Sequence, residues 1–250
     1  MAINVNTVYT TVLSILNKEQ RGYITPEEFN KLGTQVQLEI FENYFEDLNQ
    51  QLRVPQTDSE YANRQKNIDN CISIFKTIGN TTYNGAGGYF LPPSDLHRIG
   101  TVIYKDEKEL QRVERNDFLN INLSPLTKPT IQFPVYLYDQ VVQGTGGTNT
   151  GETHIFVKPT TIVTAADITV SYIRKPADVV WGYQQLGGGT WTSGPYIYNS
   201  ATSTQFELDN TEQTEVILRI LAYAGVVIRD PQIVQAASQA VQSEEVNSKS

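Results

Sequence analysis

The sequence predicts an α+β protein, with a helical bundle built from its N- and C-terminal helices and an inserted antiparallel β-rich domain of sandwich or barrel type. Apolar residues recur at three- and four-residue steps near both ends of the chain. Between them, short β-prone runs alternate with Gly, Pro, Asn and Asp. We therefore expect three segments: residues 1–80 and 207–250 as the two parts of the bundle, the second ending in a disordered tail, and residues 81–206 as the β-rich insertion with long Gly-rich loops.

The first helical part opens with a short amphipathic helix over residues 6–17 and turns at Gly22 into a long one. Thr25 suits the N-cap of the long helix, Pro26 its first position, and Glu28 completes a capping box. The apolar stripe that follows ends at Pro55, which cannot continue a helix. A third helix is expected from residue 57 to about residue 78.

The C-terminal helical pattern starts after Asp209, a good N-cap residue with Glu212 three positions later. A further helix is expected to restart at Asp230. The side chains on the apolar faces of all these helices form the predicted bundle core, which comprises Phe29, Val36, Ile40, Phe41, Tyr44, Ile68, Ile72, Phe75, Ile217, Ile220 and Leu221.

Within the insertion, two glycine-rich stretches at residues 143–154 and 183–200 are predicted to be flexible loops. They are candidate contacts between subunits, with the residues of interest being Gly146, Gly147, Gly188, Trp191 and Tyr196. Neither stretch has the Lys-Ser/Thr pair and following helix of a phosphate-binding loop.

The charge and cysteine content exclude several classes of protein. The chain has 250 residues and a net charge of −8, without a block of basic residues that could grip the phosphates of a nucleic acid. A single cysteine excludes an internal disulfide, and two scattered histidines leave no zinc constellation. With no basic leader and no membrane-spanning run, we expect a soluble protein made in a reducing cytoplasm.

Residues 17–28 partly match a calcium-binding EF-hand loop, with Gly22 at its sixth position and Glu28 at its twelfth. However, Arg21 occupies the fifth position, where an oxygen ligand is required. A helix corner followed by a capping box explains Thr25, Pro26 and Glu28 without a metal, and is the preferred interpretation.

No catalytic signature is present, and we expect neither enzymatic activity nor a cofactor. The sequence lacks both a nucleophile-elbow motif and a metalloprotease helix motif. His97 and His154 fall in β-prone runs, where they are interpreted as satisfied strand residues rather than general bases.

Four stretches together resemble a known family: "LNKEQRGYITPEEFN", "SPLTKPTIQFPVYLYD", "ITVSYIRKPADVVW" and "ILRILAYAGVVIRDPQIVQAASQ". Their order and spacing are similar to those of the head-to-tail adaptor (neck-ring or tail-tubular) proteins of short-tailed bacteriophages, especially the crAss-like phages. The resemblance extends over nearly the whole chain.

This resemblance implies a structural virion protein made in a bacterial host. It would form a homo-oligomeric ring, expected to have twelve subunits, between the portal and neighbouring neck or tail proteins. Such a ring extends the channel for genome ejection, and DNA passes through it without specific binding. An acidic protein suits a channel wall that must not retain DNA.

Two alternative functions follow from local features. Trp181, Trp191 and Tyr196 lie in aromatic loops that could stack on glycans of a cell surface. The other alternative is a degenerate EF-hand that binds calcium.

Overall fold

The computed structural model describes residues 2–18, 23–53, 59–105, 107–140, 153–185, 196–228, 235–236 and 238–243. The chain is an α+β protein that divides into two compact units. The helical unit combines Met1–Ile74 with Pro176–Ser250, and the β-unit is Phe75–Lys175. Both chain ends thus belong to one unit, and the β-unit lies between them in the sequence.

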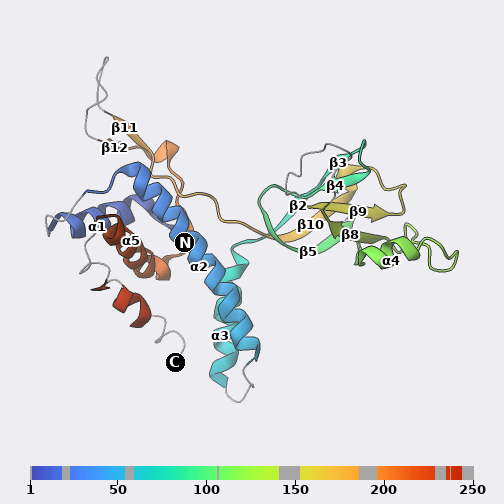
Figure 1. Cartoon of the computed structure of the whole chain (residues 1–250), viewed down its shortest axis with the longest axis horizontal. Coiled ribbons are helices and arrows are strands. Elements are labelled where there is room, and N and C mark those ends of the chain that lie inside the picture. The colour runs from blue at the N-terminus through green and yellow to red at the C-terminus, as the bar shows by residue number, and fades with distance from the viewer. Residues whose placement is uncertain are drawn as a thin grey trace. The chain divides into compact units, whose positions relative to one another are not determined.

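The helical unit contains α1 (Val5–Lys18), α2 (Pro26–Arg53), α3 (Ser59–Ser73) and α5 (Gln213–Ile228). Both α3 and α5 pack against α2, and α5 also contacts α1 (Figure 1). The side-chain oxygen of Asn4 accepts hydrogen bonds from the backbone N–H groups of Asn6 and Thr7 and so caps α1. Asp209 caps the 3-10 turn Asn210–Glu212 that leads into α5, through a bond from Thr211 N–H.

Most of the predicted bundle core is buried in the structure. The buried members are Phe29, Val36, Ile40, Phe41, Tyr44, Ile72, Phe75, Ile220 and Leu221. Two expectations were wrong in degree, because Ile68 and Ile217 are only half-buried. Phe75 is fully buried, but it begins the β-unit instead of belonging to the helical unit.

The predicted third helix was too long. It ends at Ser73, and the strand β2 (Lys76–Asn80) follows. These residues pair antiparallel with β10 (Ile168–Arg174), from Lys76 opposite Ile173 to Asn80 opposite Thr169. Backbone pairing with a distant strand therefore overrides the local helical spacing of Ile74 and Ile78, and both of these side chains are exposed.

The predicted boundary at residue 206 was also wrong, because residues 176–209 belong to the helical unit. The Gln37 amide on α2 donates to the Ala177 carbonyl oxygen at 2.7 Å and accepts from Glu207 N–H at 2.8 Å. The Thr34 hydroxyl accepts from Val179 N–H at 3.0 Å. Polar groups of α2 thus hold this returning segment, which ends in β13 (Phe206–Asp209) paired with β1 (Ala2–Ile3).

The described strands of the β-unit form two sheets. One has the order β2-β10-β5-β6, with β5 spanning Leu96–Tyr104 and β6 Lys108–Glu109. The other has the order β3-β4-β9-β8-β7, formed by Thr82–Asn84, Tyr89–Leu91, His154–Lys158, Val135–Asp139 and Gln111–Arg112. The pairing is antiparallel as predicted, except that β7 runs parallel to β8.

A hydrophobic cluster contains side chains from both sheets of the β-unit. Its buried members are Phe90, Val102, Tyr104, Leu110, Tyr136, Ile155, Val157, Ile162, Ile168, Val170 and Tyr172. Strands of alternating polarity place one face of each sheet on this cluster. The β-unit therefore has a core of its own.

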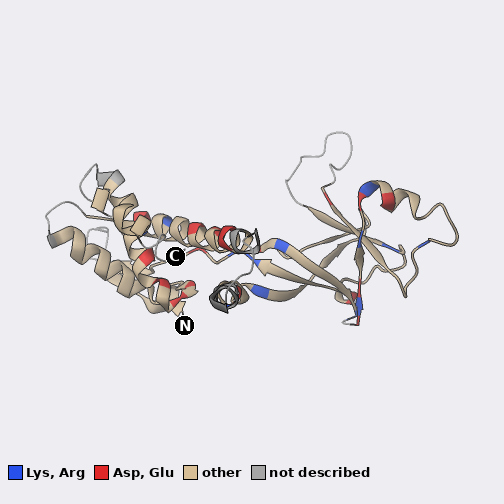
Figure 2. Ribbon diagram, turned by 90° about the horizontal axis from the view of Figure 1, so that it is seen from below, with Lys and Arg blue, Asp and Glu red and all other residues tan. Residues whose placement is uncertain are grey.

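The two units differ strongly in charge. Residues 75–175 carry ten Lys or Arg and nine Asp or Glu, a net charge of +1. The remaining residues carry nine and eighteen, a net charge of −9, which together with +1 gives the −8 of the whole chain. Acidic residues accordingly outnumber basic ones along the helices, whereas both signs occur on the β-unit (Figure 2).

Candidate functional site

The N-terminal corner contains the predicted capping box. Thr25 N–H donates to the Glu28 carboxylate at 3.0 Å, and Glu28 N–H donates to the Thr25 hydroxyl at 3.3 Å. The bond from the Thr25 backbone holds the pKa of Glu28 below its usual value. Pro26 is the first residue of α2, as predicted, whereas Gly22 lies outside the described residues.

The structure gives the calcium interpretation no ligand geometry, because residues 19–22 also lie outside the described part of the chain. Glu28, which would be the twelfth ligand of the loop, instead accepts hydrogen bonds from Thr25. Across the described residues, no three His, Cys, Asp or Glu side chains come together in a way that could hold a metal ion.

Trp181 is buried, which corrects its prediction as an exposed sugar-stacking residue. Its ring stacks on Tyr183 and lies 4.3 Å from the Tyr9 ring, measured between centroids. Its indole N–H donates to the Asn6 side-chain oxygen at 3.0 Å, and its backbone N–H donates to that of Asn30 at 2.7 Å. Trp181 is therefore part of the core that joins α1, α2 and the returning segment.

The described residues of the stretch predicted as a flexible loop, 183–185 and 196–200, include two strands. β11 (Tyr183–Gln185) pairs antiparallel with β12 (Tyr196–Tyr198). The Tyr196 ring packs edge-on against Tyr183 and remains partly exposed. Of the other candidate contact residues, Gly146, Gly147, Gly188 and Trp191 lie outside the described residues.

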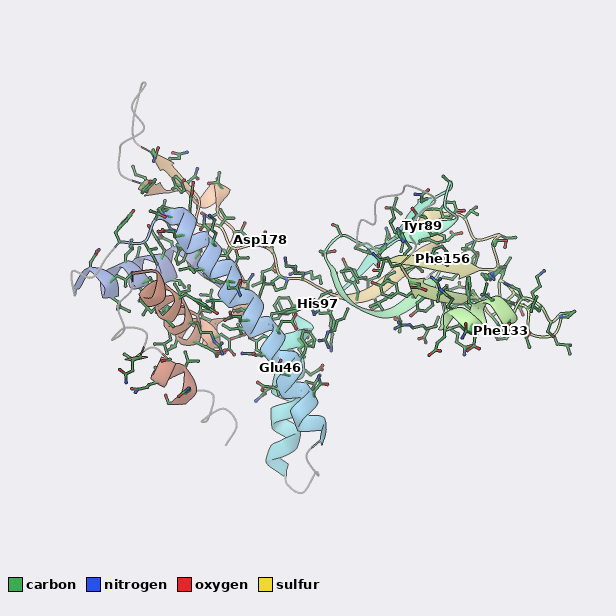
Figure 3. All side chains as sticks on the ribbon, in the orientation of Figure 1. Glu46, Tyr89, His97, Phe133, Phe156 and Asp178 are labelled. Carbon is green, nitrogen blue, oxygen red and sulfur yellow. The ribbon has the colours of Figure 1, made fainter. Side chains whose placement is uncertain are left out.

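Both histidines lie in strands, as predicted: His97 within β5 and His154 at the start of β9. His154 is buried, with its ring 4.1 Å from that of Tyr89. Tyr89 and Phe156 lie near each other in this part of the β-unit (Figure 3). Contrary to the expectation of a satisfied side chain, the His154 Nδ1 atom has no hydrogen-bond partner among the described residues.

The strongest candidate site is a segment that the sequence reasoning missed. We call residues 119–133 the apolar arm; it begins within α4 (Arg115–Asn120) and ends just before β8. Its large apolar side chains face solvent, with Leu126 97% and Phe133 75% exposed. The full set of exposed apolar side chains in the arm is Leu119, Leu123, Leu126, Ile131 and Phe133.

Hydrogen bonds within the arm fix its path. The backbone N–H groups of Thr127 and Lys128 both donate to the Ser124 carbonyl oxygen, and the Thr127 hydroxyl donates to that of Ile121 at 3.1 Å. Pro129 is buried in its second half, and Pro134, which directly follows the arm, is buried too. The arm is therefore a folded structure that presents apolar groups outward.

The arm is also anchored to the β-unit at its start. The Lys158 ammonium on β9 donates to the Phe118 carbonyl oxygen at 3.0 Å and lies 4.1 Å from the centroid of the Phe118 ring. Burial lowers the pKa of Lys158. Arg115 forms an ion pair with Asp139 on β8 at 2.6 Å. Phe133 is placed beside α4 (Figure 3).

Comparisons with known proteins do not identify a family for this chain. No protein-family model matches the sequence, and no curated protein is significantly similar to it. Within the described ranges, no helix combines the length and the apolar character that crossing a membrane requires.

Proposed function

We propose that this chain is a structural virion protein, a ring-forming adaptor between the portal and the tail of a short-tailed bacteriophage. In this role it has no enzymatic activity and needs no cofactor. The ring continues the channel through which DNA leaves the capsid, and DNA passes without specific binding. The similarity of four sequence stretches to the head-to-tail adaptor family supports this assignment.

The observation that carries the proposal is the apolar arm. Soluble monomers rarely gather several large apolar side chains on one exposed segment, and such patches typically mark surfaces that become covered on assembly. The acidic helical unit adds a second argument, because a net charge of −9 suits a wall that repels the DNA phosphates.

The test is assembly with the portal. The full chain is mixed with portal protein and examined by negative-stain electron microscopy and native mass spectrometry. We expect closed rings, with twelve copies of this chain, stacked on the portal. A chain that stays monomeric and leaves the portal unbound would contradict the proposal.

A further inference from the structure

We propose that the apolar arm of one copy docks on the acidic helical unit of the next copy, so that identical subunits join head to tail. This inference rests on the proposed ring function and deepens it by naming the two contacting surfaces. The apolar arm supplies the buried contact area. Lys128 places a positive charge against the acidic helical unit of the neighbouring copy.

The arm is suited to binding because little has to be ordered when it docks. Its backbone is already held by the bonds to Ser124 and Ile121 and by the Lys158 anchor at Phe118. Leu126 and Phe133 are presented to solvent in this arrangement. A preorganised apolar surface loses less conformational entropy on association than a mobile one.

The charge distribution identifies a second copy as the partner. Lys128 is the sole charged residue in the sequence of the arm, which lies in a unit of net charge +1. The other unit of the same chain carries −9. Each copy therefore presents both an apolar surface that carries one positive charge and an acidic surface, and complementary charges favour pairing between the two.

The same distribution disfavours a symmetric dimer through the arms. An arm-to-arm contact with Lys128 near its two-fold axis would bring two like charges together, which is unfavourable. A contact between two different patches is heterologous, and repetition of such a contact closes a ring when the rotation allows it. The charge pattern thus favours the geometry that a ring requires.

The acidic surface of α2 is the proposed receiving site. Residues 32–52 of α2 contain four acidic residues and no basic residue. Glu42 and Glu46 are both exposed and lie four residues apart, on one face of the helix. Figure 3 shows Glu46 on α2. A lysine from a neighbouring subunit that approached this face would meet the Glu46 carboxylate.

The first experiment compares the self-association of full-length variants by analytical ultracentrifugation. Leu126→Asp should raise the dissociation constant of the subunit contact by about tenfold or more, as expected for an apolar anchor at an interface. Ile78→Asp is the matched control, because Ile78 is an exposed apolar residue of the same unit outside the arm. It should leave association unchanged, and thermal melting should show that both variants are folded.

The second experiment exchanges the charges. Lys128→Glu and Glu46→Lys should each weaken association, and the double variant should recover at least part of the loss. Zero-length cross-linking of mixed ¹⁴N- and ¹⁵N-labelled chains should join Lys128 to Glu42 or Glu46 of a differently labelled copy. Cross-links from Lys128 to carboxylates of the β-unit of another copy, or single variants that associate normally, would overturn the docking.

The outcomes separate this inference from the proposed function. Rings that form on the portal and are insensitive to Leu126→Asp would leave the adaptor function standing and overturn the docking. A Leu126→Asp variant that self-associates normally but no longer binds the portal would show that the arm contacts the portal. That result would also overturn the docking. A chain that is monomeric even with portal present would overturn both.

Discussion

The Trp181 indole nitrogen and the Asn6 side-chain oxygen are joined by a 3.0 Å hydrogen bond between residues 175 positions apart. The bond links α1 to the segment that returns from the β-unit. We expect Trp181→Phe and Asn6→Ala to show a coupling energy of about 1 kcal/mol in a double-mutant cycle of chemical denaturation. As a control, Asn6→Ala combined with Gln35→Ala on the exposed side of α2 should be additive.

Gln37→Met should destabilise the protein by about 2 kcal/mol, because it removes both amide bonds to the returning segment while preserving the side-chain volume. Gln35→Met is the matched control, since Gln35 is exposed and bonds only to Glu39 among the hydrogen bonds described. Urea denaturation of both variants measures the difference. Equal effects of the two substitutions would show that the Gln37 bonds contribute nothing.

Removing the hydroxyl of Tyr44 and removing that of Tyr9 should change the free energy of unfolding in opposite directions. The Tyr44 hydroxyl is buried and has no hydrogen-bond partner among the described residues, and burial raises the pKa of Tyr44 above its usual range. Tyr44→Phe should therefore raise the free energy of unfolding by about 1 kcal/mol. The Tyr9 hydroxyl donates to the Ile24 carbonyl oxygen, so Tyr9→Phe should lower it by about 1 kcal/mol.

The capping box predicts a pH dependence of stability. The pKa of Glu28 is lower in the folded protein than in the unfolded chain, so its stabilising effect is present above about pH 4.3, the usual pKa of a glutamate. That effect is lost as the pH falls through the lower, folded-state pKa. The difference in unfolding free energy between the wild type and Glu28→Gln should therefore be largest near neutral pH and shrink in acid. Glu27→Gln, which removes a carboxylate from the same first turn of α2 and leaves the capping box intact, is the matched control.

The sequence predicted the elements whose causes are local. The capping box and the apolar stripe together placed α2, because Thr25 and Glu28 bond to each other across one turn and the stripe repeats at helical spacing within one segment. The cap at Asp209 was predicted for the same reason. These features depend on neighbours a few residues away, which a sequence displays directly.

Other features depend on partners far along the chain. Ile78 fits the helical spacing of the preceding helix, yet its backbone pairs with that of Ser171 in β10. Trp181 sits among residues typical of a loop, and its burial depends on Asn6 and Asn30. No pattern among neighbouring residues indicates the pairing of Ile78 or the burial of Trp181.

The apolar arm was missed for a different reason. Leu123, Leu126 and Phe133 are separated by prolines and follow neither a helical nor a strand period. The apolar content of this segment alone does not show whether the segment is buried or exposed. The irregular spacing of apolar residues between prolines is the signal that could have marked this segment as a surface.

The discontinuous helical unit also sets the order in which the protein can fold during synthesis. Helices α1 to α3 leave the ribosome first, but their partners, residues 176–209 and α5, are translated only after the whole β-unit. The strands of the β-unit, by contrast, are complete once Lys175 has emerged. Domains generally fold as units during translation. We therefore expect the β-unit to fold while α1 to α3 still lack the C-terminal residues that complete the helical unit.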